Sequence, residues 1–145
     1  MKINEAGIAL IKKFEGCELK AYPDPGTGDE PWTIGFGHTG SNIYPDMEIT
    51  QAQADEYLIE DLAKFERGVS QLIHVTITEN QFSALVVFSY NVGLHNLSVS
   101  HLLTKVNNKD FKGGAEEFLR WDRAGGEVLP GLVKRRAAER QLFLS

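Results

Sequence analysis

The fold of this chain is decided by one stretch of its sequence, W-T-I-G-F-G-H at residues 32–38. It follows a strand-like segment, L-K-A-Y at 19–22, and a turn-forming segment, P-D-P-G-T-G-D-E-P at 23–31. We therefore predict two short strands, at 19–22 and 32–38, joined by a turn. Alternation along the second strand puts Trp32, Ile34, Phe36 and His38 on one side and Thr33, Gly35 and Gly37 on the other. The glycine face indicates either close approach by a ligand or a twisted edge strand with bulges.

Helical patterns flank this glycine-rich region. Asn4 can cap a first helix that Gly16 ends, and capping boxes begin at Thr50 and at Thr78, the second opening a helix that ends at Gly93. Shorter helices are predicted near residues 99–106, 110–122 and 131–143. The pattern predicts an α+β fold in a single domain, 1–145. Its parts are a small lobe with a short antiparallel sheet (about 15–50), a connecting helix (about 51–72) and a mainly helical lobe (about 73–145 plus the N-terminal helix 4–15).

The composition is that of a globular chain. Of the 145 residues, 42% are hydrophobic and 24% are charged, which excludes a disordered chain. The formal net charge of −5 argues against a nucleic-acid partner, since that affinity depends on phosphate neutralisation. Apolar runs are far shorter than the ~20 residues that span a bilayer, so we expect no stable membrane insertion. The single cysteine, Cys17, excludes an intramolecular disulfide.

Glu15 lies at the C-terminal end of the first predicted helix, where the helix dipole disfavours a carboxylate. That position, with Glu18 nearby and apolar neighbours, favours the neutral form that a general acid needs. The alternative is a solvated helix-end residue that pairs with Lys12.

Asp24 lies between Pro23 and Pro25, which stiffen the backbone and hold its carboxyl in a defined direction. Ordinary turn chemistry is the alternative, because Asp is common in turns. Together, Glu15 and Asp24 are a carboxyl pair of the kind that glycoside hydrolysis uses. Thr33, on the glycine face, can then hold a water against Asp24.

Several motifs resemble those of the phage-type lysozymes, glycoside hydrolase family 24. The active-site signature is similar in F-E-G at 14–16, A-Y-P-D at 21–24 and W-T-I-G-F-G-H at 32–38. The similarity continues through I-T-Q-A-Q-A-D-E-Y-L at 49–58, N-Q-F-S-A-L-V-V-F-S-Y-N-V-G at 80–93 and G-L-V-K-R-R-A-A-E-R-Q-L-F at 131–143, and it covers nearly the whole chain. The resemblance implies a lysozyme-like fold and an endolysin muramidase, which hydrolyses the β-1,4 bond between N-acetylmuramic acid and N-acetylglucosamine in bacterial peptidoglycan.

The resemblance also implies the catalytic roles. Glu15 would be the general acid, and Asp24 and Thr33 would direct the attacking water, with inversion of the anomeric centre and with no cofactor or metal. Two alternatives remain open: a lytic transglycosylase that uses the same acid, and a non-catalytic glycan-binding module.

For substrate binding, the resemblance points to His38, Thr39, Tyr90, Asn91 and Ser100, each with packing or capping as its alternative. Arg135 and Arg136 would pair with Glu15 or with the backbone around it, the alternative being a solvated basic face balanced by Glu139. The segment between Asp24 and Thr33 is longer than in familiar members, so Asp29 and Glu30 compete with Asp24 as the base.

The same resemblance sets expectations for partners and location. The substrate would be peptidoglycan glycan strands, and the protein would act as a monomer. We expect neither an N-terminal membrane anchor nor a separate wall-binding module, and an endolysin of this kind would be made in the host cytoplasm. It would reach the cell wall in the periplasm after membrane permeabilisation by a holin-type pore.

Overall fold

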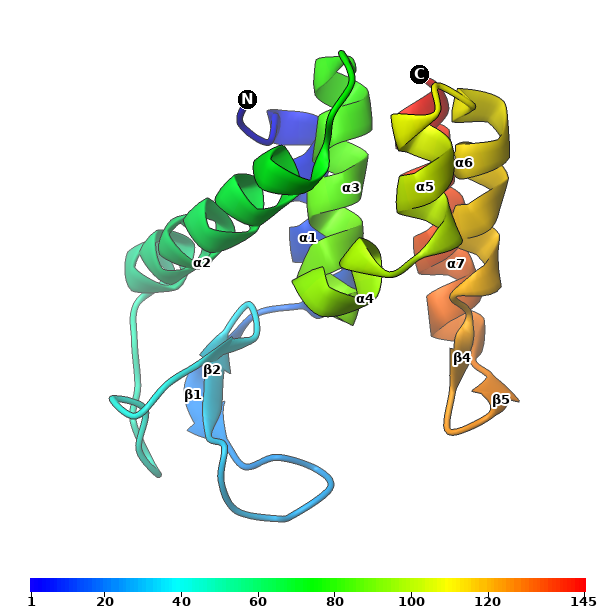
Figure 1. The fold of residues 1–145 in the computed structure, drawn as a ribbon. Coiled ribbons are helices and arrows are strands. Elements are labelled where there is room, and N and C mark those ends of the chain that lie inside the picture. Colours follow the sequence, from blue (N-terminus) through cyan, green and yellow to red (C-terminus); the bar gives the residue numbers. More distant parts are fainter. The chain divides into compact units, whose positions relative to one another are not determined.

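A computed structural model describes residues 1–145, which divide into two compact units. One unit comprises residues 11–64, and the other comprises residues 1–10 and 65–145. The boundaries fall inside two helices, α1 (Glu5–Glu15) and α2 (Gln51–Leu72), which are labelled in Figure 1. Helices and small antiparallel sheets confirm the predicted α+β class.

The unit of residues 11–64 contains a three-stranded antiparallel sheet in the order β1 (Glu18–Tyr22), β2 (Thr33–Gly35), β3 (His38–Thr39). Thr33 is central, because it lies opposite Tyr22 on one side and opposite Thr39 on the other. The free edge of β1 is covered by the segment 47–49: Ala21 donates to the Met47 carbonyl and Ile49 to the Leu19 carbonyl, each at 2.9 Å. This edge is therefore protected from pairing with other chains.

The single strand predicted at 32–38 is wrong. β2 ends at Gly35, a turn follows at Phe36 and Gly37, and β3 returns from His38, which lies opposite Ile34. Gly35 and Gly37 have φ angles of 67° and 87°, which only glycine adopts without strain, so they permit this tight hairpin. The residues predicted to share one side differ in exposure, because Trp32 and His38 are half-buried whereas Ile34 and Phe36 are buried.

The second unit is built around α3 (Glu79–Val92), whose residues 82–89 are all buried. Its other helices are α4 (Leu94–Ser98), α5 (His101–Asn107), α6 (Phe111–Glu117), a 3-10 turn (Phe118–Arg120) and α7 (Pro130–Leu144). α7 packs along α3, and α5 packs against α6 (Figure 1). Phe88, Phe118 and Phe143 make ring contacts in this core, with centroids 5.4 and 5.5 Å apart.

The predicted helix starts are confirmed by their capping bonds. The Asn4 side chain accepts from Gly7 at 3.0 Å, and both capping boxes form, Thr50 with Gln53 and Thr78 with Gln81. The helix predicted at 110–122 is shorter, since α6 ends at Glu117 and a 3-10 turn follows.

Two elements were not predicted. One is α4, and the other is a hairpin of β4 (Arg123–Ala124) and β5 (Glu127–Val128). The hairpin turns at Gly125-Gly126, where φ is 60° and 84°, as a type I′ turn requires.

Asn80, in the first turn of α3, binds residues near both chain ends. Its side-chain carbonyl oxygen accepts from the Asn4 side-chain amide at 2.7 Å, and its own side-chain amide donates to the Ser145 hydroxyl at 2.9 Å.

None of the helices combines the length and apolar character that crossing a membrane requires.

Candidate functional site

Glu15 is the last residue of α1 and is half-buried. Gly16 ends the helix as predicted: it has φ 68°, and its N–H donates to the Lys12 carbonyl at 3.2 Å. The alternative partner of Glu15, Lys12, pairs instead with Asp55 at 3.3 Å. Glu15 is therefore the C-terminal residue of α1, and the ion pair of Lys12 is with Asp55 on α2.

Tyr22 is a site residue that the sequence analysis did not single out. It ends β1, lies opposite Thr33 and precedes Asp24 by two residues. Burial raises the pKa of the Tyr22 hydroxyl, and the negative charges of Glu15 and Glu18 raise it further. Tyr22 therefore pairs with Thr33 in the sheet and is among the groups on which the charge of Glu15 acts.

Asp24 begins a turn in which its carboxylate and its backbone groups form hydrogen bonds with residues 26–29. Its Oδ2 accepts from the backbone N–H groups of Gly26 and Thr27, both at 3.1 Å, and its carbonyl accepts from Gly28 at 2.7 Å. Its backbone N–H donates to the Asp29 carbonyl at 3.0 Å. The two hydrogen bonds to Oδ2 fix the orientation of the Asp24 carboxylate. No group of the chain donates to Oδ1, so this oxygen is open to accept a hydrogen bond from another molecule.

The competing acids Asp29 and Glu30 lie in the same turn and are exposed. Asp29 accepts a hydrogen bond from the Trp32 indole Nε1 at 3.2 Å, which gives it a structural task. Thr33 is half-buried, and its hydroxyl makes no hydrogen bond within the chain. Of the three carboxylates in the turn, only the Asp24 carboxylate accepts hydrogen bonds from backbone N–H groups. Asp24 is also the one that lies nearest to Tyr22 in the sequence.

His38 is held inside the unit of residues 11–64. Its Nδ1 lies 2.8 Å from Asp61 Oδ2, and its ring stacks on Tyr57 with centroids 4.2 Å apart and planes at 5°. The Nε2 atom is buried without a hydrogen-bond partner. These contacts hold the His38 ring in one orientation, whereas Thr39, next to it, is exposed.

The other predicted substrate contacts lie in the second unit. Tyr90 is half-buried with its ring edge-on to Phe65 at 5.3 Å, and Asn91 is exposed at the end of α3. Ser100 is buried and caps α5: it accepts from the Leu103 N–H at 3.1 Å and donates to the Leu97 carbonyl at 2.7 Å. The capping alternative therefore describes Ser100.

Arg135, Arg136 and Glu139 form a buried charged cluster on α7, so the solvated basic face considered as an alternative is wrong. Glu139 lies 3.0 Å from Arg136 Nη1 and 3.4 Å from Arg135 Nε. Burial raises the pKa of Glu139 to about 7, although the two guanidinium groups act to lower it. Arg136 also donates to the Asn91 side-chain oxygen and stacks over Phe88 at 5.0 Å, which connects the cluster to the exposed end of α3.

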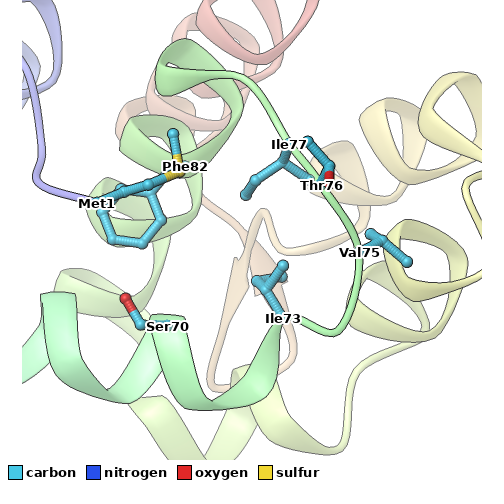
Figure 2. A pocket seen from close by; sticks show the side chains of 7 residues that line it. All are labelled: Met1, Ser70, Ile73, Val75, Thr76, Ile77 and Phe82. Carbon is cyan, nitrogen blue, oxygen red and sulfur yellow. The ribbon is translucent and has the colours of Figure 1, made fainter.

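A separate cavity of about 270 Å³ lies near the start of α3 (Figure 2). Figure 2 shows Met1, Ile73, Val75 and Ile77 around it, with Phe82 on α3. No carboxyl, imidazole or thiol side chain lines it, so it offers no acid–base chemistry. No group of three His, Cys, Asp or Glu side chains is placed to hold a metal ion.

Comparison with known proteins gives consistent matches. Residues 12–139 match the family model described as phage lysozyme. The chain is 48% identical over 145 residues to an endolysin of Bacillus phage B103, of which it spans 55%, so it covers about half the length of that relative. It is 39% identical over 149 residues to an endolysin of Salmonella phage P22, covering 100% of this chain and 99% of that protein.

Solved structures are also similar to this chain. The muramidase domain of SpmX from Asticaccaulis excentricus superposes with a TM-score of 0.91 at 37% identity, covering 99% of this chain and 98% of that one. The predicted lysozyme-like fold is confirmed by the similarity to the crystal structure of a mutant P22 lysozyme, with a TM-score of 0.87 at 38% identity, covering 100% of this chain and 99% of that one.

Proposed function

Since the chain belongs to the phage lysozyme family, we propose that it is an endolysin muramidase that hydrolyses the β-1,4 bond between N-acetylmuramic acid and N-acetylglucosamine in bacterial peptidoglycan. The observation that carries this proposal is the arrangement around Tyr22. Tyr22 lies opposite Thr33, precedes Asp24 by two residues and experiences the charge of Glu15.

In the proposed reaction, Glu15 donates its proton to the glycosidic oxygen as the bond to the anomeric carbon breaks. The open Oδ1 of Asp24 accepts a hydrogen bond from a water molecule and receives its proton as the water attacks that carbon. The Thr33 hydroxyl, which has no partner within the chain, orients the same water. Two backbone N–H groups at 3.1 Å hold the Asp24 carboxylate in one direction, which limits the reorganisation needed in the transition state.

A lytic transglycosylase needs no external water and no second carboxylate, because the acid, once it has given its proton to the glycosidic oxygen, can accept the proton of the sugar's own attacking hydroxyl. The fixed Asp24 carboxylate with one open oxygen supports a hydrolase over that alternative. A glycan-binding module without turnover needs neither carboxyl group.

The test compares wild type with Glu15→Gln and Asp24→Asn. The assay follows turbidity loss of permeabilised Gram-negative cells, and mass spectrometry identifies the released muropeptides. We expect each variant to lose at least about a hundredfold in rate. Glu5→Gln, an exposed carboxyl at the opposite end of the same helix, and Asp46→Asn, an exposed turn residue, are matched controls that should keep wild-type activity.

Reducing-end muropeptides from wild type alone would support the hydrolase. Anhydro-sugar products, or full activity of Asp24→Asn, would identify a transglycosylase instead. Wall binding without any product would identify a binding module, and near-normal lysis by Glu15→Gln would remove Glu15 from the acid role.

We further propose that the protein is made in the host cytoplasm, acts as a monomer and reaches the periplasmic cell wall through a holin-type pore. Expression in intact bacteria, with and without a co-expressed pore-forming protein, tests this route. Lysis that needs the pore is the expected result, and lysis without it would contradict the proposed route.

A further inference from the structure

The turn that follows Asp24 is held by hydrogen bonds and not by packing, since residues 25–30 are all exposed. The backbone N–H of Asp24 donates to the Asp29 carbonyl at 3.0 Å, which fixes the backbone where the turn begins. The carboxylate of Asp24 depends on the tip of the turn, because its donors within the chain are the backbone N–H groups of Gly26 and Thr27. Whatever fixes this tip therefore also fixes the proposed base.

The Thr27 hydroxyl is the side-chain group that joins the tip to the returning arm of the turn, residues 29–31. It donates to the Glu30 carbonyl at 2.8 Å and accepts from the Asp29 N–H at 3.2 Å. The backbone N–H of the same residue donates to Asp24 Oδ2 at 3.1 Å. Thr27 therefore bonds the carboxylate through its backbone and the returning arm through its side chain, a local use of a hydroxyl that is common in turns.

The returning arm is in turn bonded to the residue that precedes β2. The indole N–H of Trp32 donates to Asp29 Oδ1 at 3.2 Å, and Trp32 is half-buried directly before Thr33. A series of hydrogen bonds thus connects Trp32 with Asp29, Asp29 with Thr27, and Thr27 with Asp24. This series relates the proposed base to the strand that carries the threonine proposed to orient the water, and Thr27 is its middle member.

The tip of the turn approaches the carboxylate closely at Gly26. A Cβ atom added to Gly26 would lie 3.1 Å from Asp24 Oδ2, which is tighter than ordinary van der Waals contact. A residue without a side chain is therefore suited to this position. Because the backbone of the tip touches Oδ2 directly, a shift of the tip changes the orientation of the carboxylate.

We infer that Thr27 is a positioning residue for the proposed base: its hydroxyl holds the tip so that two backbone N–H groups keep Oδ2 of Asp24 bonded and leave Oδ1 open for the attacking water. The inference rests on the proposed function, since it takes Asp24 as the base. Without the hydroxyl, the carboxylate enters other staggered rotamers, and fewer molecules hold the base in the productive geometry. Substrate binding does not use this hydroxyl, so kcat falls while KM stays the same.

The test compares Thr27→Val with Thr27→Ser, with soluble glycan strands of peptidoglycan as the substrate and released reducing ends as the readout. Valine keeps the branched shape and loses both hydroxyl bonds, so we expect kcat to fall about tenfold with KM unchanged. Serine keeps the hydroxyl and should retain kcat within about twofold of wild type. Thr76→Val makes the same exchange at an exposed position of the other unit and should leave kcat unchanged. Circular dichroism verifies that each variant is folded.

The same exchange in Asp24→Asn protein separates positioning from a general structural effect. If Thr27 acts through the carboxylate, Thr27→Val costs no further rate once the base is absent. An equal loss in both backgrounds, a loss that Thr27→Ser shares, or a normal kcat in Thr27→Val overturns the inference. Full activity of Asp24→Asn overturns the proposed base role as well, whereas an inactive Asp24→Asn beside a fully active Thr27→Val overturns this inference alone.

Discussion

The His38–Asp61 pair should stabilise the folded chain by about 2 kcal/mol. Nδ1 of His38 lies 3.0 and 2.8 Å from the two Asp61 oxygens, and the side chains are 13% and 27% exposed. Breaking a fully buried pair costs roughly 3–5 kcal/mol, whereas an exposed pair contributes roughly 0.2–1 kcal/mol. This pair lies between those limits, so Asp61→Ala should lower the free energy of unfolding by about 2 kcal/mol and Tm by roughly 6 °C.

Urea unfolding followed by circular dichroism measures this change. Asp55→Ala is the matched control on the same helix, because the Lys12–Asp55 pair at 3.3 Å has side chains 41% and 44% exposed. We expect the control to lose less than about 1 kcal/mol. Asp61→Asn keeps a hydrogen-bond acceptor and should fall between wild type and Asp61→Ala. Equal losses in Asp61→Ala and Asp55→Ala would refute the argument from burial.

Two further predictions concern the second unit. Phe82 is 1% exposed, so Phe82→Ala should cost about 3–5 kcal/mol in urea unfolding, while Leu119→Ala, at a site 38% exposed, should cost far less; similar losses would contradict the burial argument. The pKa of Glu139 is raised from 4.5 to about 7 in the folded chain, so the folded state binds more protons than the unfolded state between these values. Stability should therefore fall as pH rises from about 4.5 to about 7, by at most roughly 3 kcal/mol, and Glu139→Gln should lose this component. A wild-type pH profile that Glu139→Gln reproduces would show that other groups cause the slope.

Local signals in the sequence predicted the helices well. A capping box needs only residues three positions apart, so Thr50 with Gln53 and Thr78 with Gln81 could be identified without any tertiary information. Glu15 could be placed at a helix end for the same reason, because Gly16 directly follows it.

Features that depend on register or on backbone angles were harder to predict. Period-2 alternation is equally compatible with one strand and with a tight hairpin, so the turn at Phe36 and Gly37 was missed. Tyr22 gains its place in the site only because it pairs with Thr33, eleven positions away. The hydrogen bond from Trp32 to Asp29 likewise depends on how the turn closes, which composition alone does not determine.

The contacts of Asn80 with Asn4 and Ser145 have a consequence for chain connectivity. Two side chains that reach the same amide lie close enough for a short flexible linker to join residue 145 to residue 1, since each added residue spans up to ~3.3–3.6 Å. New termini could then be opened in the exposed Gly125-Gly126 turn, where few packing interactions are lost. A circular permutant of this kind should keep the native fold, with α7 preceding α1 along the polypeptide.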